Sequence, residues 1–487
     1  MVDTTELAPG LRIPRIVTGL WQVADIERGG HTLDPVASAG ELAAYARDGF
    51  TAFDMADHYG SSEVIAGQAK AQGVPLQAFT KWCPPPAAMT PEVVRAAVDL
   101  ARRRMQTDCI DLMQFHWWSF EHPQYIDAMA ELAALRRQGW IKHLGLTNFD
   151  TAHLRLLLSQ GVPMATNQVC ISLLDRRALG EMSSLCLSRG VRLLAYGTLG
   201  GGFLSDKWLG APEPGTVNDW SKMKYRRFID AVGGWEALQG VLRAADRIAK
   251  KHRVSIANVA TRWVLEQPAV AAVIVGARLG ESEHRADNQR LFQFVLDDED
   301  RGWLEEAFGM TKAIPGDCGD EYRKPPFLTA SGDLSHHLDS LPSVFTVKPF
   351  ADRPQRQRVD SGSVWEPLAG YSRAIRDGNR IAVSGTTATH GSAGVIAPED
   401  AGAQTTYIID KIAASLRSVG GSLEDVIRTR VYLSDVNDWE PVARAHGRAF
   451  AGIMPANTML QVGALIGQGY RVEIEAEAVV RDLSLRA

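Results

Sequence analysis

Eight short apolar runs, spaced along roughly the first 280 residues and separated by amphipathic stretches, constrain the fold more than any other feature of the chain. Each run is continuously apolar, which is typical of parallel strands buried on both faces. Eight strands alternating with helices match the size and order of a (β/α)8 TIM barrel. A doubly wound sheet is the structural alternative, but no G-x-G-x-x-G motif follows the first strand. The expected strands are Arg15–Trp21, Phe50–Ala56, Leu76–Trp82, Leu112–His116, His143–Phe149, Ala165–Ser172, Val191–Gly197 and Ala271–Ala277.

The alternation ends near residue 312, which divides the chain. With 487 residues the protein is too long for one ordinary core, so we expect at least two domains. Residues 1–312 are predicted to form the α/β barrel, and the segment 313–344, rich in Pro, Gly, Ser and Asp, a linker. Residues 345–487 then follow a strand, hairpin, helix, strand, helix, strand pattern, which predicts one smaller α+β domain.

Composition and charge indicate which kinds of binding partner and which cellular compartment to expect. Hydrophobic residues make up 45% and charged residues 22% of the chain, as in globular proteins. The net charge is −5 without a long basic run, so we expect no nucleic-acid partner. No apolar run approaches the roughly 20 residues that cross a membrane, and the N-terminus does not resemble a signal peptide. The five cysteines lack paired spacing and no metal site is predicted, so we expect a reduced, cytoplasmic protein.

Polar side chains stand at the ends of three consecutive expected strands, where active sites of such barrels lie. Asp54 and Tyr59 follow the second strand within F-D-M-A-D-H-Y-G. Lys81 closes the third strand within F-T-K-W, and His116 closes the fourth within M-Q-F-H-W-W. Each residue alone has an ordinary structural explanation, such as a paired buried lysine or a satisfied core histidine. Together at one end of a barrel they indicate a catalytic site.

These side chains suit the reduction of a carbonyl group. The developing alkoxide needs a proton, which the hydroxyl of Tyr59 can supply. A free tyrosine has a pKa near 10, but the ammonium of Lys81 close by favours the phenolate. Asp54 can pair with that lysine, and His116 can donate a hydrogen bond to the carbonyl oxygen.

On these residues the sequence resembles the aldo-keto reductase family. The words F-D-x-A-x-x-Y-G and I-D-L-x-Q-x-H-W agree with that family, whose catalytic tetrad falls on Asp54, Tyr59, Lys81 and His116. The resemblance implies NAD(P)H-dependent reduction of an aldehyde or ketone, or the reverse oxidation of an alcohol. It also implies a stacking role for Tyr196 against the nicotinamide. The cofactor-binding positions that the resemblance implies are Trp21, Thr147, Asn148, Gln168, Tyr196, Leu199, Gly201, Gly276, Arg278, Asp287 and Asn288.

The cofactor's phosphates need donors near the seventh and eighth strands. Glycines 200–202 allow the backbone to approach closely, and Arg278 can pair with a 2′-phosphate. Two residues depart from the family pattern: Leu279 replaces a common phosphate-binding hydroxyl, and His284 replaces a common arginine. We expect NADP(H) in preference to NAD(H). Trp117 and Trp118, directly after His116, are expected to line the substrate pocket.

From about Phe345 the chain resembles the Rid (YjgF-like) family of small imine and enamine deaminases. The resemblance implies a chorismate-mutase-like α+β domain that assembles as a homotrimer, whereas the barrel is expected to be self-contained. The matching words are G-Y-S-R-A at 370–374, V-S-G-T at 383–386, G-G-S-L-E-D-V at 420–426, V-Y-L-S-D at 431–435 and V-E-I-E-A at 472–476.

One departure limits what the second resemblance implies for function. Active Rid deaminases grip the substrate carboxylate with an arginine in V-x-V-x-R-L, and here Ala464 stands at that position. Asn457 replaces another frequent arginine. We therefore expect a trimerisation scaffold or a small-molecule binding unit. Two alternatives stay open: a cofactor-bound sensor or regulatory subunit, and an imine-processing bifunctional enzyme with an active Rid-like cleft.

Overall fold

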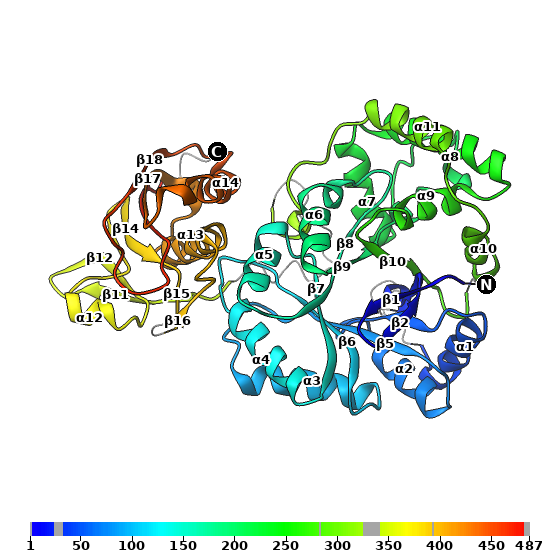
Figure 1. Cartoon of the computed structure of the whole chain (residues 1–487), viewed down its shortest axis with the longest axis horizontal. Helices are drawn as coiled ribbons and strands as arrows, with labels where there is room; N and C mark the ends of the chain where they lie inside the picture. The colour runs from blue at the N-terminus through cyan, green and yellow to red at the C-terminus, as the bar shows by residue number, and fades with distance from the viewer. Residues whose placement is uncertain (1, 24–32, 282–283, 325–340, 392–393, 482–487) are drawn as a thin grey trace.

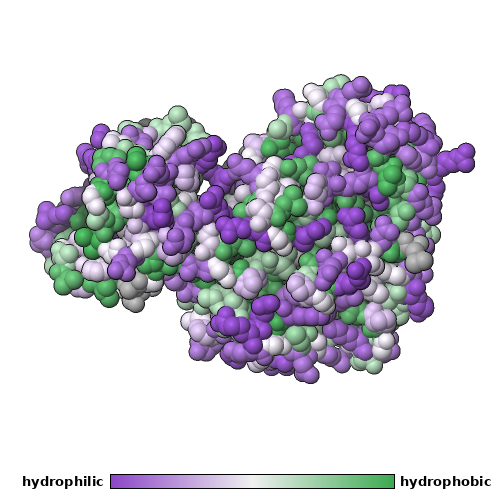
Figure 2. Space-filling view, in the orientation of Figure 1, coloured by the Kyte–Doolittle hydropathy of each residue, from purple (hydrophilic) through white to green (hydrophobic). Residues whose placement is uncertain are grey.

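The computed structural model describes residues 2–23, 33–281, 284–324, 341–391 and 394–481, which form two bodies joined side by side (Figure 1). Most of the expected linker, residues 325–340, lies outside the described residues. Among the helices that are described, none is long and apolar enough to span a bilayer. On the face in Figure 2, hydrophilic side chains cover much of both bodies, and apolar side chains gather in small groups.

The larger body is a closed barrel of eight parallel strands, which confirms the predicted fold. Strand β10 pairs with both β9 and β3 and so closes the ring. All eight expected strands are present, each shifted by only a few residues at its ends. They are β3 (Ile16–Gly19), β4 (Ala52–Asp54), β5 (Gln77–Trp82), β6 (Ile110–His116), β7 (Ile141–Thr147), β8 (Met164–Cys170), β9 (Arg192–Tyr196) and β10 (Val270–Gly276).

Helices surround the barrel, and α3 begins with a capping residue followed by proline. Thr90 accepts a hydrogen bond from the backbone N–H of Val93, and Pro91 occupies the first position of α3. The helices are α1 (Pro35–Arg47), α2 (Ser62–Ala71), α3 (Pro91–Arg104), α4 (Tyr125–Arg137), α5 (Thr151–Ser159), α6 (Glu181–Arg189), α7 (Trp220–Ala231), α8 (Trp235–His252), α9 (Ile256–Leu265), α10 (Arg285–Arg290) and α11 (Asp298–Gly309).

A short antiparallel hairpin, β1 (Thr4–Ala8) and β2 (Leu11–Pro14), precedes the barrel and was not expected from the sequence. Its Leu7, Leu11 and Ile13 are buried in one apolar cluster with residues from the first halves of several barrel strands. The hairpin therefore covers the end of the barrel opposite the strand ends that carry the polar residues.

The smaller body is a seven-stranded sheet with two long helices packed on one face. Six neighbouring strands pair antiparallel, whereas β17 and β18 pair parallel at one edge. In spatial order the strands are β11 (Thr346–Phe350), β12 (Arg353–Asp360), β13 (Ala374–Asp377), β14 (Arg380–Thr387), β19 (Val472–Val479), β17 (Val426–Leu433) and β18 (Ala456–Gln461). The helices are α12 (Trp365–Ala369), α13 (Ala401–Ser418) and α14 (Trp439–Phe450).

Helix α13 lies between this sheet and α5 of the barrel, so it joins the two bodies (Figure 1). Nearly every residue of α13 from Ala401 to Leu416 is buried. Ion pairs add to the contact: the Arg155 guanidinium meets Asp400 at 2.7 Å, and Arg417 meets Glu121 at 3.0 Å.

Candidate active site

Three of the four tetrad candidates converge at the C-terminal ends of their strands, and the fourth follows in the next loop. Lys81 Nζ donates to Asp54 Oδ2 at 2.5 Å and to the Met55 carbonyl at 2.9 Å. The same ammonium lies 4.7 Å from the centre of the Tyr59 ring. Asp54 and Lys81 are each 3% exposed, so this ion pair is shielded from water. The structure thus brings together the residues that the sequence grouped by strand order.

The second carboxylate oxygen of Asp54 is held by two amides. Asp54 Oδ1 accepts from Gln114 Nε2 at 3.0 Å and from Gln168 Nε2 at 2.8 Å. Gln168 was expected to contact the cofactor, whereas Gln114 was not singled out in the sequence. These hydrogen bonds hold the Asp54 carboxylate in one position, which in turn fixes the position of the Lys81 side chain.

His116 is buried at the floor of the site with a free ring nitrogen. Among the described residues its Nε2 has no hydrogen-bond partner. The ring stacks on Trp118 with centroids 4.3 Å apart and meets the edge of Tyr322 at 5.3 Å. Burial, and then the positive charge of Arg323, lower the pKa of His116 well below its ordinary value. A neutral imidazole with an unpartnered nitrogen can donate one hydrogen bond to a ligand.

A cavity of about 440 Å³ opens in front of these side chains. Its wall contains all four tetrad candidates, Trp118 and Lys224, together with His58, Cys83 and Tyr322, which the sequence did not single out for the site. The expected cofactor positions that line the cavity are Trp21, Thr147, Asn148, Gln168, Tyr196, Leu199, Gly201, Gly276 and Arg278.

Three expected site residues do not line the cavity. Trp117 is fully buried in the core, where its indole N–H donates to the His122 carbonyl at 2.9 Å. Asp287 accepts hydrogen bonds from Ser255 and Asn258 at 3.0 and 2.9 Å, and so ties α10 to the start of α9. Asn288 follows it on α10, also outside the cavity wall. Trp117 points away because the chain turns after His116, which leaves Trp118 as the pocket tryptophan.

The loop after β9 can accept phosphate groups. Glycines 200, 201 and 202 adopt positive φ angles of 53°, 64° and 91°, a conformation that costs other residues more than glycine. A Cβ atom on Gly201 would lie 2.8 Å from the Tyr225 side chain. At the cavity rim the Arg278 guanidinium pairs with Asp219 at 2.9 Å and its side chain is 45% exposed. These features fit a dinucleotide cofactor, with backbone donors and a rim cation for its phosphates.

The segment 317–323 contributes Tyr322 to the cavity wall, although these residues were expected to be part of the linker. Tyr196 donates its hydroxyl to Asn148 Oδ1 at 2.8 Å, and the hydroxyl lies 3.1 Å from Glu321 Oε1. Glu321 is fully buried and pairs with Arg177 at 2.9 Å. The segment is packed because its charged and aromatic side chains find partners on the barrel. The only hint in the sequence is the D-E-Y-R stretch at 320–323 among Pro and Gly residues.

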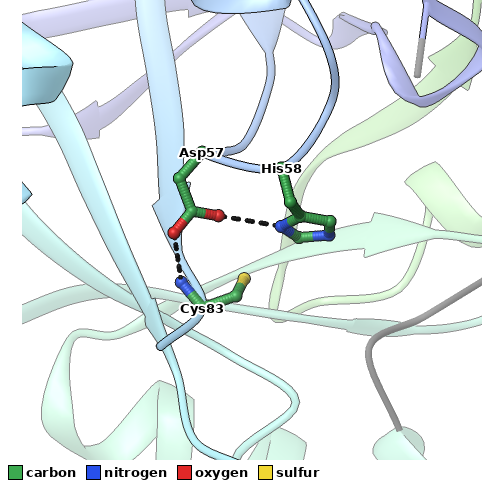
Figure 3. Close-up of side chains that lie close together, drawn as sticks. All are labelled: Asp57, His58 and Cys83. Atoms are coloured by element: carbon green, nitrogen blue, oxygen red, sulfur yellow. Dashed lines mark hydrogen bonds and ion pairs between the residues drawn. The ribbon is translucent and has the colours of Figure 1, made fainter. Parts of the chain in front are cut away.

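Asp57, His58 and Cys83 gather beside the tetrad in an arrangement that could suggest a metal site (Figure 3). Both oxygens of Asp57 are already engaged, Oδ1 with His58 Nδ1 at 2.8 Å and Oδ2 with the Cys83 backbone N–H at 3.0 Å. These bonds tie the loop that carries Tyr59 to the end of β5. We therefore interpret the cluster as a brace for this loop.

Comparisons with known proteins match this architecture in both domains. A family model described as the aldo/keto reductase family matches residues 15–307, so the chain belongs to that family. A second model, described as Endoribonuclease L-PSP, matches residues 362–480. The protein is therefore an aldo/keto reductase barrel fused to a domain of the YjgF/Rid type.

Individual relatives agree with this division of the chain. The protein tas of Escherichia coli is 29% identical over 241 residues, which cover 45% of this chain and 68% of that protein. A RutC family protein of Pyrococcus abyssi is 35% identical over 114 residues, covering 23% of this chain and 87% of that protein. The solved glycerol dehydrogenase of Gluconobacter oxydans shares the barrel fold at 24% identity, with a TM-score of 0.53 over 65% of this chain and 98% of that structure.

Proposed function

We infer that this chain, as a member of the aldo/keto reductase family, is an oxidoreductase that reduces carbonyl compounds with a nicotinamide cofactor. We propose that Tyr59 donates the proton in that reduction, with Lys81, Asp54 and His116 as its catalytic partners. The observation that carries the proposal is the buried Asp54–Lys81 pair, whose ammonium lies 4.7 Å from the Tyr59 ring.

A bound nicotinamide cofactor would supply the hydride to the carbonyl carbon, and the chain's own residues would bind and protonate the carbonyl oxygen. Tyr59 gives its hydroxyl proton to the developing alkoxide, and the Lys81 ammonium stabilises the phenolate charge that remains. Asp54 keeps Lys81 in place through the 2.5 Å contact. The charges of Asp54 and Lys81 are therefore paired before proton transfer, and the new phenolate charge of Tyr59 forms beside the Lys81 ammonium.

His116 orients the carbonyl group. Its low pKa keeps the ring neutral, so it does not compete with Tyr59 as the acid. The free Nε2 can donate to the carbonyl oxygen, which gains negative charge as the reaction proceeds. Trp118, stacked on His116, limits how the substrate can enter.

For the cofactor, we propose that NADP(H) is preferred over NAD(H) through Arg278. The guanidinium lies at the cavity rim, and its present partner Asp219 also accepts from Lys222 at 2.9 Å. A 2′-phosphate can replace Asp219 as the partner of Arg278 because the side chain is 45% exposed and can reorient. His284 also lines the cavity and is a second candidate for contact with that phosphate.

For the C-terminal domain, we propose a scaffold or small-molecule binding role, with assembly into a homotrimer. Ala464 is exposed and carries no group that could hold a carboxylate. Exposed Leu460 and Ile466, at 44% and 75%, offer apolar contact near the β18 edge. The sheet face opposite α13 also carries charged side chains, since Arg430 pairs with Glu475 at 2.6 Å. Light scattering of the full chain tests this, and a monomer at micromolar concentration would contradict the trimer.

The reductase proposal is tested by a screen of aldehydes and ketones with NADPH and with NADH, followed through nicotinamide absorbance. We expect turnover with at least one carbonyl class and a lower KM for NADPH. An intact protein that binds either cofactor but reduces no carbonyl compound would contradict the proposal.

A further inference from the structure

The cavity holds a buried ammonium group that the proposed mechanism does not use. Lys224, on α7, is 7% exposed and belongs to the cavity wall. Its Nζ donates to the Tyr322 hydroxyl and lies 4.9 Å from the Tyr196 ring centre and 4.2 Å from that of Tyr322. Across the described part of the chain, no carboxylate forms an ion pair with Lys224. A buried ammonium with only a hydroxyl and aromatic faces as partners is incompletely compensated.

The carboxylate of Glu321, which interacts electrostatically with Lys224, is bonded to other residues. Glu321 is fully buried, but its Oε2 pairs with Arg177 at 2.9 Å and its Oε1 lies 3.1 Å from the Tyr196 hydroxyl. Burial would raise the pKa of Glu321, but the charges of Arg177 and then Lys224 outweigh burial and lower it, so Lys224 interacts with this carboxylate at a distance without a direct bond. The Lys224 ammonium can therefore still donate hydrogen bonds to a ligand in the cavity.

The position of Lys224 favours the substrate end of the cavity over the phosphate end. Tyr322, its hydrogen-bond partner, packs against His116 at 5.3 Å and Trp118 at 6.1 Å. Lys222, two residues earlier on α7, instead pairs with Asp219 beside Arg278 at the rim. Residues two apart on a helix point in different directions, so the two lysines serve different ends of the cavity.

Building on the reductase function proposed above, we propose that Lys224 binds an anionic group of the substrate, with the Tyr322 hydroxyl as second donor. The substrate class is then a carbonyl compound that also carries a carboxylate. Its carbonyl oxygen meets Tyr59 and His116 while its carboxylate meets Lys224 and Tyr322. Two donors on one carboxylate give both affinity and orientation.

The test compares two matched aldehydes, 4-carboxybenzaldehyde and its methyl ester, in the full-length protein with NADPH. Lys224→Met removes the charge and keeps most of the side-chain length, while Lys224→Arg keeps the charge. Arg227→Met removes a cation from the same helix outside the cavity wall and serves as control. We expect Lys224→Met to raise KM for the carboxylate aldehyde at least about tenfold, the scale of a charge-assisted hydrogen bond. KM for the ester should change less than about twofold, and Lys224→Arg should restore most of the difference.

Binding without turnover separates this inference from the proposed function. The NADPH-loaded protein is titrated with benzoate and with benzamide in a calorimeter. We expect the wild type and Arg227→Met to bind benzoate, and Lys224→Met to lose this binding. The wild-type protein could reduce neither aldehyde and still bind benzoate in a way that depends on Lys224. That result would refute the proposed reductase function but support the anion site. Equal effects of Lys224→Met on both aldehydes, or on benzoate and benzamide, would overturn the site. Weaker NADPH binding with an unchanged aldehyde preference would instead assign Lys224 to a cofactor phosphate and also overturn it.

Discussion

The barrel and the C-terminal domain both bury charged side chains, but they direct them to different places. In the barrel, Asp54, Lys81 and His116 face a cavity of about 440 Å³. In the C-terminal domain, Asp410 and Asp400 on and before α13 face the barrel and bind its side chains. The contrast indicates that the barrel carries the chemistry, whereas the polar groups of α13 fix how the two domains dock.

The most buried part of this contact is a histidine between two carboxylates. His153 Nδ1 lies 2.8 Å from Asp150, and its Nε2 lies 3.2 Å from Asp410, which also accepts from Tyr125 at 2.8 Å. The imidazole stacks on Phe120 with centroids 3.4 Å apart. Burial alone would lower the pKa of His153, but the two carboxylates outweigh it and raise that pKa to about 9.

The docking contact lies close to the active site along the chain. Asp150 caps α5 directly after the loop that holds Asn148, whose side chain binds the Tyr196 hydroxyl. The Arg323 guanidinium donates to the Asn148 carbonyl at 2.6 Å and covers the Phe120 ring at 4.3 Å. The second domain can therefore influence the part of the cavity lined by Tyr196 and Asn148 through a short path of contacts.

The largest expected effect comes from Asp410→Ala, which removes one carboxylate and leaves His153 buried and half-paired. We expect a loss of about 3–5 kcal/mol in unfolding free energy, the usual cost of breaking a buried ion pair. Urea unfolding measures it, with Arg417→Gln as control. Arg417 and Glu121 are 40% and 38% exposed, so their pair contributes below about 1 kcal/mol. Equal losses in the two variants would refute the docking role of Asp410.

The same cluster predicts a pH dependence. The folded pKa of His153, about 9, is raised above the ordinary value near 6.5, so its stabilising contribution is complete below pH 6.5. It is lost progressively as the pH rises from 6.5 through about 9. Thermal melts of the wild type should show this decline, and melts of His153→Gln should not. A wild-type profile as flat as the variant's would contradict a charged His153.

Tyr59→Phe should break the chemistry of the barrel and leave the docking contact unchanged. We expect turnover to fall at least about a hundredfold, the scale of general acid catalysis. Cofactor affinity and the urea midpoint should stay near wild type, since the hydroxyl is the only group removed. Single-turnover kinetics with chemistry limiting provide the measurement. More than a tenth of wild-type turnover would exclude Tyr59 as the proton donor.

Arg278→Ala should weaken NADPH more than NADH. We expect the Kd for NADPH to rise about tenfold more than the Kd for NADH. This factor is near the lower end of the effect of losing a charge-assisted hydrogen bond, because Arg278 is partly exposed and already bound to Asp219. Fluorescence titration of both cofactors measures the ratio. Equal weakening of the two would place Arg278 at the pyrophosphate or in a purely structural role.

The smallest change is expected on cutting the chain within residues 325–340. From the sequence alone, a self-contained barrel should separate from the C-terminal piece. The buried α13 and its contacts with α5 predict instead that the pieces stay together through gel filtration. Separation of the pieces would show that the domains are held only by the chain connection.

Local sequence patterns were sufficient for the barrel and for the core of the site. Eight continuous apolar runs, alternating with amphipathic stretches, predicted eight parallel strands, because such runs are typical of strands buried on both faces. Once the strands are aligned in parallel, their C-terminal ends must meet, which brings Asp54, Lys81 and His116 together without further information.

Tertiary structure decided the parts that depend on partners distant in the chain. Residues 317–323 follow no periodic pattern, yet Glu321 and Tyr322 are buried because Arg177 and Lys224 offer them partners. Trp117 and Trp118 are neighbours of the same type, but only the folded chain directs one to the core and the other to the cavity. The contact of Asp410 with His153, 257 residues apart, is equally invisible in the sequence. A local pattern reports how a segment buries its own apolar side chains, whereas the pairing of polar groups depends on which segments the fold brings side by side.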